Sequence, residues 1–78
     1  MQFDKTAAGK AIRALRTEKG LSQEVLSGLA GIARSHLSMI ETGEKQPNFE
    51  TIWRLATALD MRPNELVKRI EDANTRSQ

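Results

Sequence analysis

The segment 20-GLSQEVLSGLAGIARSHLSMIETG-43 decides the fold, because two short apolar stripes meet in it at Gly31. Apolar residues recur at helical spacing on both sides of this glycine, and no stretch of the chain alternates at period two as a strand does. Ser22 is a good N-cap for a helix over 22–30, and a second helical stripe follows over 33–42. The segment therefore predicts two short helices joined by a tight turn.

Two helices that cross at such a turn need a small residue at the crossing and an apolar plug just after the turn. Ser27 and Ile32 meet these two needs. We expect the core-facing residues of the pair to be Leu26, Leu29, Ala30, Leu37 and Ile40. Any helical hairpin in a small bundle has a glycine turn and apolar stripes, so this pattern alone does not separate a functional motif from a structural one.

The outer face of the second helix is more informative. At about 100° per residue, four polar residues cluster opposite the apolar pair Leu37 and Ile40: Arg34, Ser35, Ser38 and Thr42. Short polar side chains on this face let a helix lie deep in a groove.

Further helices are predicted on both sides of this pair. Helical stripes run over 6–19 and 48–60, with Asn48 as the N-cap of the latter, and a last helix begins at Pro63. The helix over 48–60 carries Phe49, Ile52, Leu55, Ala56 and Leu59 at core spacing, and the apolar side of the last helix is formed by Leu66, Val67 and Ile70. We therefore expect one compact all-α domain of five helices over residues 1–72, followed by a frayed polar tail over 73–78.

The composition limits the classes of function. The 78 residues suffice for one domain with a small core, and the formal net charge is only +2. Positive charge gathers over residues 5–19, where Glu18 is the one acid among five cations: Lys5, Lys10, Arg13, Arg16 and Lys19. Charge alone leaves two interpretations open, a phosphate-facing surface or a solvated helix face.

Several classes are disfavoured. The chain has no cysteine and one histidine, so we expect no disulfide, metal site or cofactor. No stretch is apolar enough for a membrane span or a signal peptide, and we expect a cytoplasmic protein. Nothing positions the histidine as a catalytic base, so we expect no enzymatic activity.

Residues 9–68 resemble the Cro and phage-repressor type of helix-turn-helix domain, also called the Xre family. The resemblance rests on a combined pattern whose parts are Arg16, Ser22, Gln23, Leu26, Ser27, Gly31, Arg34, Leu37, Ile40, Glu41, Gly43, Pro47 and Leu59. It implies a lambda-repressor-like fold in which the helix over 33–42 reads double-stranded DNA through the major groove. It also implies a transcriptional regulator that binds a pseudo-palindromic operator as a homodimer, without a small-molecule ligand.

The family resemblance assigns roles to individual residues. The residues expected to contact bases are Arg34, Ser35, Ser38 and Met39. The residues expected to contact phosphates are Arg16, Gln23, His36, Lys45, Gln46 and Asn48. Arg16 and Glu41 are also expected to form a structural ion pair.

Three positions depart from the family pattern. Gly28 lies inside the helix over 22–30, where glycine costs about 1 kcal/mol relative to alanine. Ala33 stands where a capping Ser or Thr is usual, and Met39 stands where a basic residue is common. The methionine replaces a polar contact by an apolar one, for which a thymine methyl is a suitable partner. Elsewhere, His36 is more typical of a surface or phosphate-side residue than of a pH switch, and Trp53 of packing or an interface than of base stacking.

A dimer interface is predicted at the far end of the domain from the reading helix. One helix covers only about 4–5 base pairs, so two copies about 34 Å apart are needed for a specific site. The residues expected at this interface are Met61, Pro63, Val67 and Ile70. A monomer in which all of these are core is the alternative.

The sequence does not decide between several kinds of function. The resemblance fits a restriction-modification controller or a phage-type regulator equally well. An antitoxin or adaptor would use the same fold mainly to bind a protein. A fragment of a nucleic-acid enzyme is disfavoured, because the chain lacks a set of acid, metal and nucleophile residues.

Overall fold

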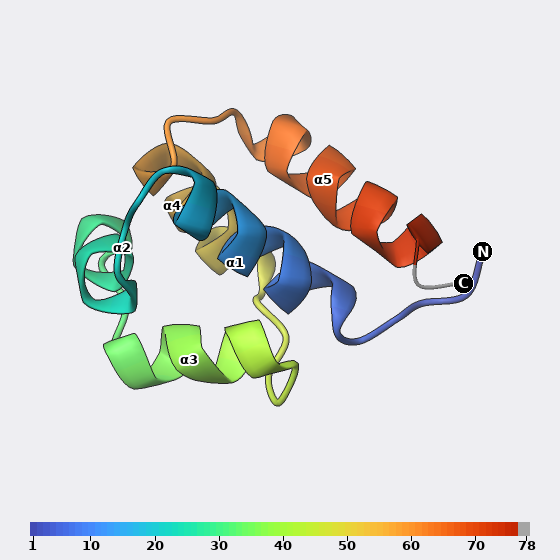
Figure 1. The fold of residues 1–78 in the computed structure, drawn as a ribbon, viewed down its shortest axis with the longest axis horizontal. Coiled ribbons are helices and arrows are strands. Elements are labelled where there is room, and N and C mark those ends of the chain that lie inside the picture. The colour runs from blue at the N-terminus through green and yellow to red at the C-terminus, as the bar shows by residue number, and fades with distance from the viewer. Residues whose placement is uncertain (77–78) are drawn as a thin grey trace.

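The computed structural model of the chain describes residues 1–76, and this part consists of five α-helices without a strand (Figure 1). The helices are α1 (Ala7–Glu18), α2 (Gln23–Ala30), α3 (Arg34–Thr42), α4 (Phe49–Ala58) and α5 (Pro63–Arg76). The all-α, five-helix class predicted from the sequence is confirmed.

The helix ends follow the predicted signals. The side chains of Ser22 and Asn48 accept hydrogen bonds from the backbone N–H groups of Val25 and Thr51, which caps α2 and α4. Gly31 ends α2 with φ of 71°, a left-handed conformation that suits glycine. Local sequence therefore sets where α2 begins and where the chain turns toward α3.

All five helices contribute to one core around α1, which lies between α3 and α5 (Figure 1). The largest fully buried side chains are Ile12, Leu26, Leu37, Ile40, Leu55, Leu59 and Leu66. Because α3 buries both Leu37 and Ile40 in this cluster, its orientation is fixed by the same core that holds the domain together.

Gly9 determines how closely α1 approaches α3. A Cβ atom at this position would overlap the backbone carbonyl groups of Ile40 and Glu41, at the end of α3. Any side chain larger than hydrogen would therefore push the two helices apart. This contact, which the sequence pattern did not reveal, brings the side chains of α1 within reach of Glu41.

Two residues expected in the core are exposed. Leu29 is 63% exposed because the inner face of α2 is centred on Leu26, Ser27 and Ala30, so that Leu29 points to one side. The small side chain of Ser27, 3% exposed, lets the neighbouring helix pack at that position. Phe49 is 72% exposed, since the buried face of α4 is formed by residues later in the helix.

The polar tail was expected to be frayed, but its residues 73–76 form the last turn of α5. Asn74 is 5% exposed, and its side-chain Oδ1 accepts a 2.6 Å hydrogen bond from the backbone N–H of Asp4. Its Nδ2 donates a 2.7 Å hydrogen bond to the carbonyl of Gln2. These bonds attach the N-terminal segment to the end of α5; residues 77–78 of the predicted tail lie outside the described part.

Candidate nucleic-acid interface

The outer face of α3 is the candidate reading surface. Arg34 and Ser35 are exposed at the start of the helix, while Ser38 and Met39 are half-buried along it. Figure 1 shows α3 along the lower edge of the domain, with no other helix below it. The four side chains that the family resemblance assigns to base contacts therefore belong to one helix at the surface of the domain.

The first turn of α3 has no side-chain cap. Ala33 occupies the N-cap position with an extended backbone (φ −68°, ψ 144°), but its methyl group accepts no hydrogen bond. The backbone N–H groups that begin an α-helix are donors without intrahelical partners, and the helix dipole makes this end positive. The start of α3 therefore offers donors and positive charge beside Arg34. His36, in the same first turn of the helix, is half-buried.

Arg16, Gln23 and Glu41 form a hydrogen-bonded cluster where α1, α2 and α3 meet. Arg16 donates to both carboxylate oxygens of Glu41: Nε to Oε2 at 2.7 Å and Nη2 to Oε1 at 2.9 Å. Gln23 Nε2 donates to the same carboxylate at 3.0 Å. The Arg16 and Glu41 side chains are 15% and 3% exposed, so the predicted ion pair is present and largely buried.

This cluster fixes the side chains that the resemblance assigned to phosphate contacts. The third guanidinium nitrogen of Arg16, Nη1, donates to the carbonyl of Leu21 at 2.9 Å. Hydrogen bonding to Glu41 raises the pKa of Arg16 above its ordinary value, with burial acting in the opposite direction. Arg16 therefore stays cationic and tied to Glu41, while Gln23 is held at the start of α2 by its amide nitrogen.

The loop between α3 and α4 holds the other predicted phosphate contacts. Lys45 is exposed in it. Gln46 Nε2 donates to the carbonyl of Lys5 at 2.5 Å, and Asn48 Oδ1 caps α4. Two of the three predicted side chains therefore also have a structural role, and the loop is attached to the N-terminal segment.

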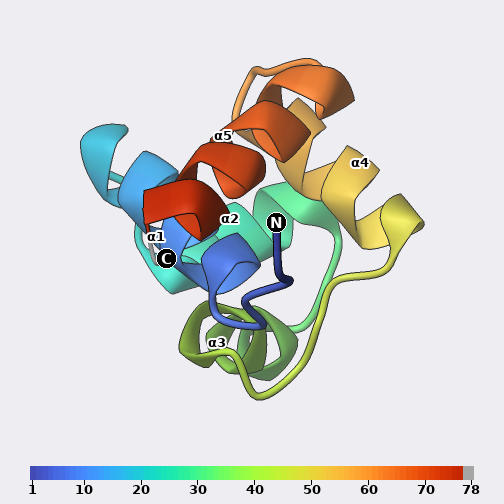
Figure 2. The ribbon, with the colours of Figure 1, turned by 90° about the vertical axis from the view of Figure 1, so that its right-hand side faces the viewer.

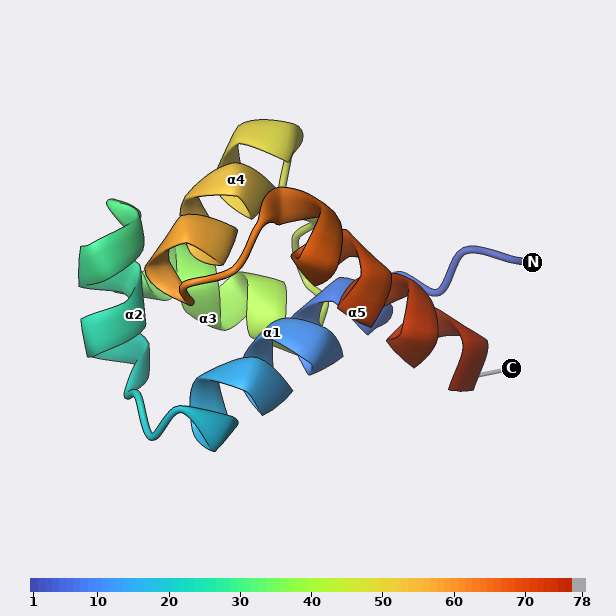
Figure 3. The same ribbon diagram turned by 90° about the horizontal axis from the view of Figure 1, so that it is seen from above.

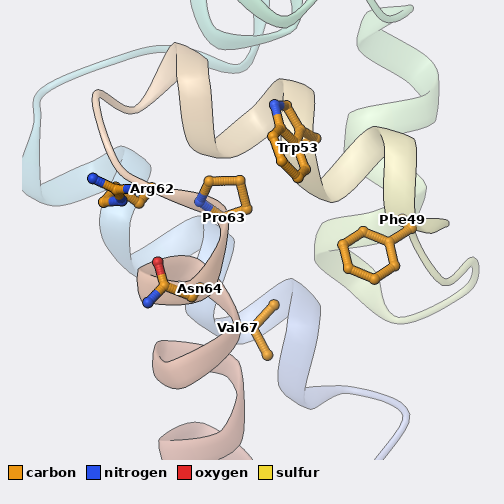
Figure 4. A pocket seen from close by; sticks show the side chains of 6 residues that line it. All are labelled: Phe49, Trp53, Arg62, Pro63, Asn64 and Val67. Atoms are coloured by element: carbon orange, nitrogen blue, oxygen red, sulfur yellow. The ribbon is translucent and has the colours of Figure 1, made fainter.

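The predicted interface residues divide into two pairs. Met61 and Ile70 are half-buried and pack against the core of their own chain. Pro63 and Val67 instead line an apolar groove of about 480 Å³ between α4 and α5 (Figure 4). The complete lining is Phe49, Trp53, Arg62, Pro63, Asn64 and Val67. Phe49 is therefore not a core residue as expected, and its spacing of four residues from Trp53 places the two rings on a common face of the helix.

Comparison with known proteins identifies the family of this domain. The sequence profile of the helix-turn-helix family HTH_3 matches residues 12–66. The chain belongs to this helix-turn-helix family. The match confirms the resemblance to the Xre type of DNA-binding transcriptional regulator and runs from the middle of α1 to the first turn of α5.

Individual relatives are similar over most of this helix-turn-helix chain. An uncharacterized HTH-type transcriptional regulator of Sinorhizobium fredii, y4dJ, is 39% identical over 59 residues, which cover 76% of this chain and 77% of the relative. The restriction-modification controller protein C.AhdI from Aeromonas hydrophila is 46% identical with a TM-score of 0.77, over 81% of this chain and 96% of that chain. The DNA-binding domain of the P22 C2 repressor is 30% identical with a TM-score of 0.76, over 85% and 87% of the two chains. Two other matched regulators are longer, and the match spans 26% and 24% of their lengths.

Two further observations concern other kinds of site in this helix-turn-helix domain. Over residues 1–76, no three His, Cys, Asp or Glu side chains gather in a way that would hold a metal ion. In the same part of the chain, no helix has the length and apolar character needed to cross a membrane.

Proposed function

We propose that this protein is a sequence-specific transcriptional regulator that binds a pseudo-palindromic operator as a homodimer, with α3 in the major groove. The observation that carries the proposal is the exposed polar face of α3, with Arg34 and Ser35 at its start, on a helix whose opposite face is locked into the core. A rigidly mounted helix with short side chains is what the second helix of a helix-turn-helix presents to DNA.

Arg34 is the side chain proposed to read a base directly. The guanidinium group of arginine matches the two acceptors that guanine presents in the major groove. Ser35 and Ser38 would contact base edges or phosphates beside it, and Met39 would contact a thymine methyl. Because few side chains here carry a base-specific hydrogen-bond pattern, DNA shape would contribute to specificity.

Phosphate contacts would surround this reading surface. Lys45 supplies an exposed positive charge in the loop after α3, and His36 is half-buried on α3 itself. The proposal also includes Gln46, Asn48 and the start of α2 at Gln23. Arg16 would contact a phosphate only through the part of its side chain that stays exposed, since its guanidinium is hydrogen-bonded to Glu41 and Leu21.

The proposed dimer follows from the dimensions of DNA. Half-sites that face the same way lie about 34 Å apart, and the domain measures 33 Å along its longest axis. Two copies placed side by side are therefore of the right size to present two reading helices to one face of the duplex. The proposed contact surface is around Pro63 and Val67, which line the apolar groove, with Met61 and Ile70 supporting it from the core.

The 46% identity with C.AhdI supports a controller-type role among these regulators. A protein with this target would act in the cytoplasm. Neither catalysis nor a small-molecule ligand is part of the proposal.

Binding to DNA tests the proposal directly. After selection of the preferred site from random DNA, its affinity should fall steeply between low and physiological salt, because phosphate contacts release counterions. Arg34→Ala should weaken the selected site by about 1–3 kcal/mol and affect random DNA much less. An affinity that does not change with salt would refute DNA binding and favour the antitoxin or adaptor alternative, whereas equal losses on both DNAs would place Arg34 on phosphate.

A further inference from the structure

Large apolar side chains are unevenly distributed over the surface of this domain. Among residues 1–76, seven such side chains are exposed, and five of them line two grooves on α4, α5 and the N-terminal segment. These five are Met1, Phe3, Phe49, Trp53 and Val67; the other two, Val25 and Leu29, belong to α2. A gathering of this kind on a small domain marks an interaction surface.

The two grooves lie along α5 and meet at Val67, which lines both. The first groove, with Phe49 and Trp53, lies at the beginning of α5 (Figure 4). The second, of about 270 Å³, lies toward the other end of α5 and is lined by Met1, Gln2, Phe3, Val67, Ile70, Glu71 and Asn74. Figures 2 and 3 show the N-terminal segment near the end of α5, away from the start of α4.

Asn74 holds the N-terminal segment in a defined position on this face. Its buried side-chain amide bonds to the backbone of Gln2 and of Asp4, the residues on either side of Phe3. The Phe3 side chain is nevertheless 76% exposed. A large aromatic side chain whose backbone is already fixed loses little freedom on binding, which is the property of an interface anchor.

We propose that Phe3 of one chain inserts into the Phe49–Trp53 groove of a second copy of the chain, and that this exchange forms the dimer. The inference rests on the proposed homodimer and names the contact that forms it. A two-fold axis that lies in the plane of the interface, and crosses the line between the two grooves at right angles at its midpoint, places each groove of one chain over the other groove of its copy. Both copies then make the same contact.

The charges at the two grooves are complementary under this symmetry. Arg62 lines the first groove and Glu71 lines the second. The two-fold axis brings Arg62 of each chain near Glu71 of the partner subunit, so opposite charges meet twice at the rim. The first groove, at about 480 Å³, is large enough for an aromatic side chain, and Trp53 and Phe49 offer ring faces and edges against which it packs.

Sedimentation equilibrium of Phe3→Ser against the unmodified protein tests the contact. Each dimer contains two copies of Phe3, and loss of one buried aromatic weakens association about tenfold or more, so the dissociation constant should rise by about 100-fold. Leu29→Ser is the matched control, since Leu29 is similarly exposed but belongs to α2. Circular dichroism should show that both variants stay folded, because neither side chain is in the core.

Trp53 provides a second readout, because it is the one tryptophan of the chain and is 57% exposed in the isolated domain. Its emission should move to shorter wavelength as the unmodified protein dimerises, and Phe3→Ser should shift this change to about 100-fold higher concentration. The absence of cysteine from the sequence allows a third test. Phe3→Cys protein mixed with Asn64→Cys protein should form a disulfide-linked heterodimer on mild oxidation.

The outcomes separate this inference from the proposed function. An unchanged dissociation constant for Phe3→Ser, with Trp53 still shielded in the dimer, would overturn the exchange of Phe3 but leave the dimer intact. Unmodified protein that stays monomeric at high micromolar concentration would overturn both. Dimerisation that depends equally on Phe3 and on the α2 control Leu29 would indicate nonspecific apolar association and would also refute the inference.

Discussion

Removal of the Glu41 carboxylate is expected to be among the most destabilising single changes in this domain. The carboxylate is 3% exposed and accepts three hydrogen bonds, two from Arg16 and one from Gln23. Loss of one partner of a buried ion pair typically costs about 3–5 kcal/mol, because the other charge stays buried. Arg16 is 15% exposed and keeps its bond to the Leu21 carbonyl, so we expect the lower end, about 3 kcal/mol, for Glu41→Ala.

Urea unfolding measures this loss. A domain of 78 residues has a total stability of roughly 4–12 kcal/mol. With a urea dependence near 1 kcal/mol per molar, the midpoint should fall by about 3 M. Glu50→Ala is the matched control, because the Glu50–Arg54 pair is exposed and its loss should cost less than about 0.5 kcal/mol. A Glu41→Ala midpoint equal to that of the control would refute the reasoning.

Two further predictions concern the helices of the reading unit. Ala33→Ser should stabilise the domain by about 1 kcal/mol, because the extended backbone at Ala33 suits a cap and the present side chain provides none; an unchanged thermal midpoint would contradict this. Gly28→Ala should stabilise it by about 0.5–1 kcal/mol, because Gly28 is exposed inside α2 and a Cβ there meets no atom within 4 Å. Gly31→Ala is the contrasting variant and should destabilise in the same assay, since its φ of +71° is strained for alanine.

Local signals explain why the helix-turn-helix was predictable from the sequence. The caps at Ser22 and Asn48 and the left-handed glycine at Gly31 act within three or four residues along the chain, and each was predicted where the structure has it. The Arg16–Glu41 pair is not local, and only the family resemblance indicated it. Its geometry depends on the close approach of α1 to α3 at Gly9, which no pattern in either helix reveals.

Periodicity does not show which of two apolar faces a helix buries. Residues of α4 at core spacing include Ile52 and Leu55, but Phe49 and Trp53 form a second apolar face on the same helix. A small domain has too little interior for both faces, and the buried face of α4 is the one that packs against α2 and α5. The contact of Asn74 with the N-terminal segment was equally hidden, because 70 residues separate Asn74 from Asp4.

The α3 helix is held unequally along its length, and this bears on how it would read DNA. Its last turn is fixed by the close contact with Gly9 and by Glu41, which binds side chains from α1 and α2. Its first turn, which contains Arg34, lacks a side-chain cap at Ala33. In the proposed complex, phosphate oxygens would satisfy the donors that a serine cap would otherwise occupy. Ala33→Ser should therefore raise the stability of the free protein more than it raises affinity for the operator, because the added hydroxyl competes with DNA for the same backbone N–H groups.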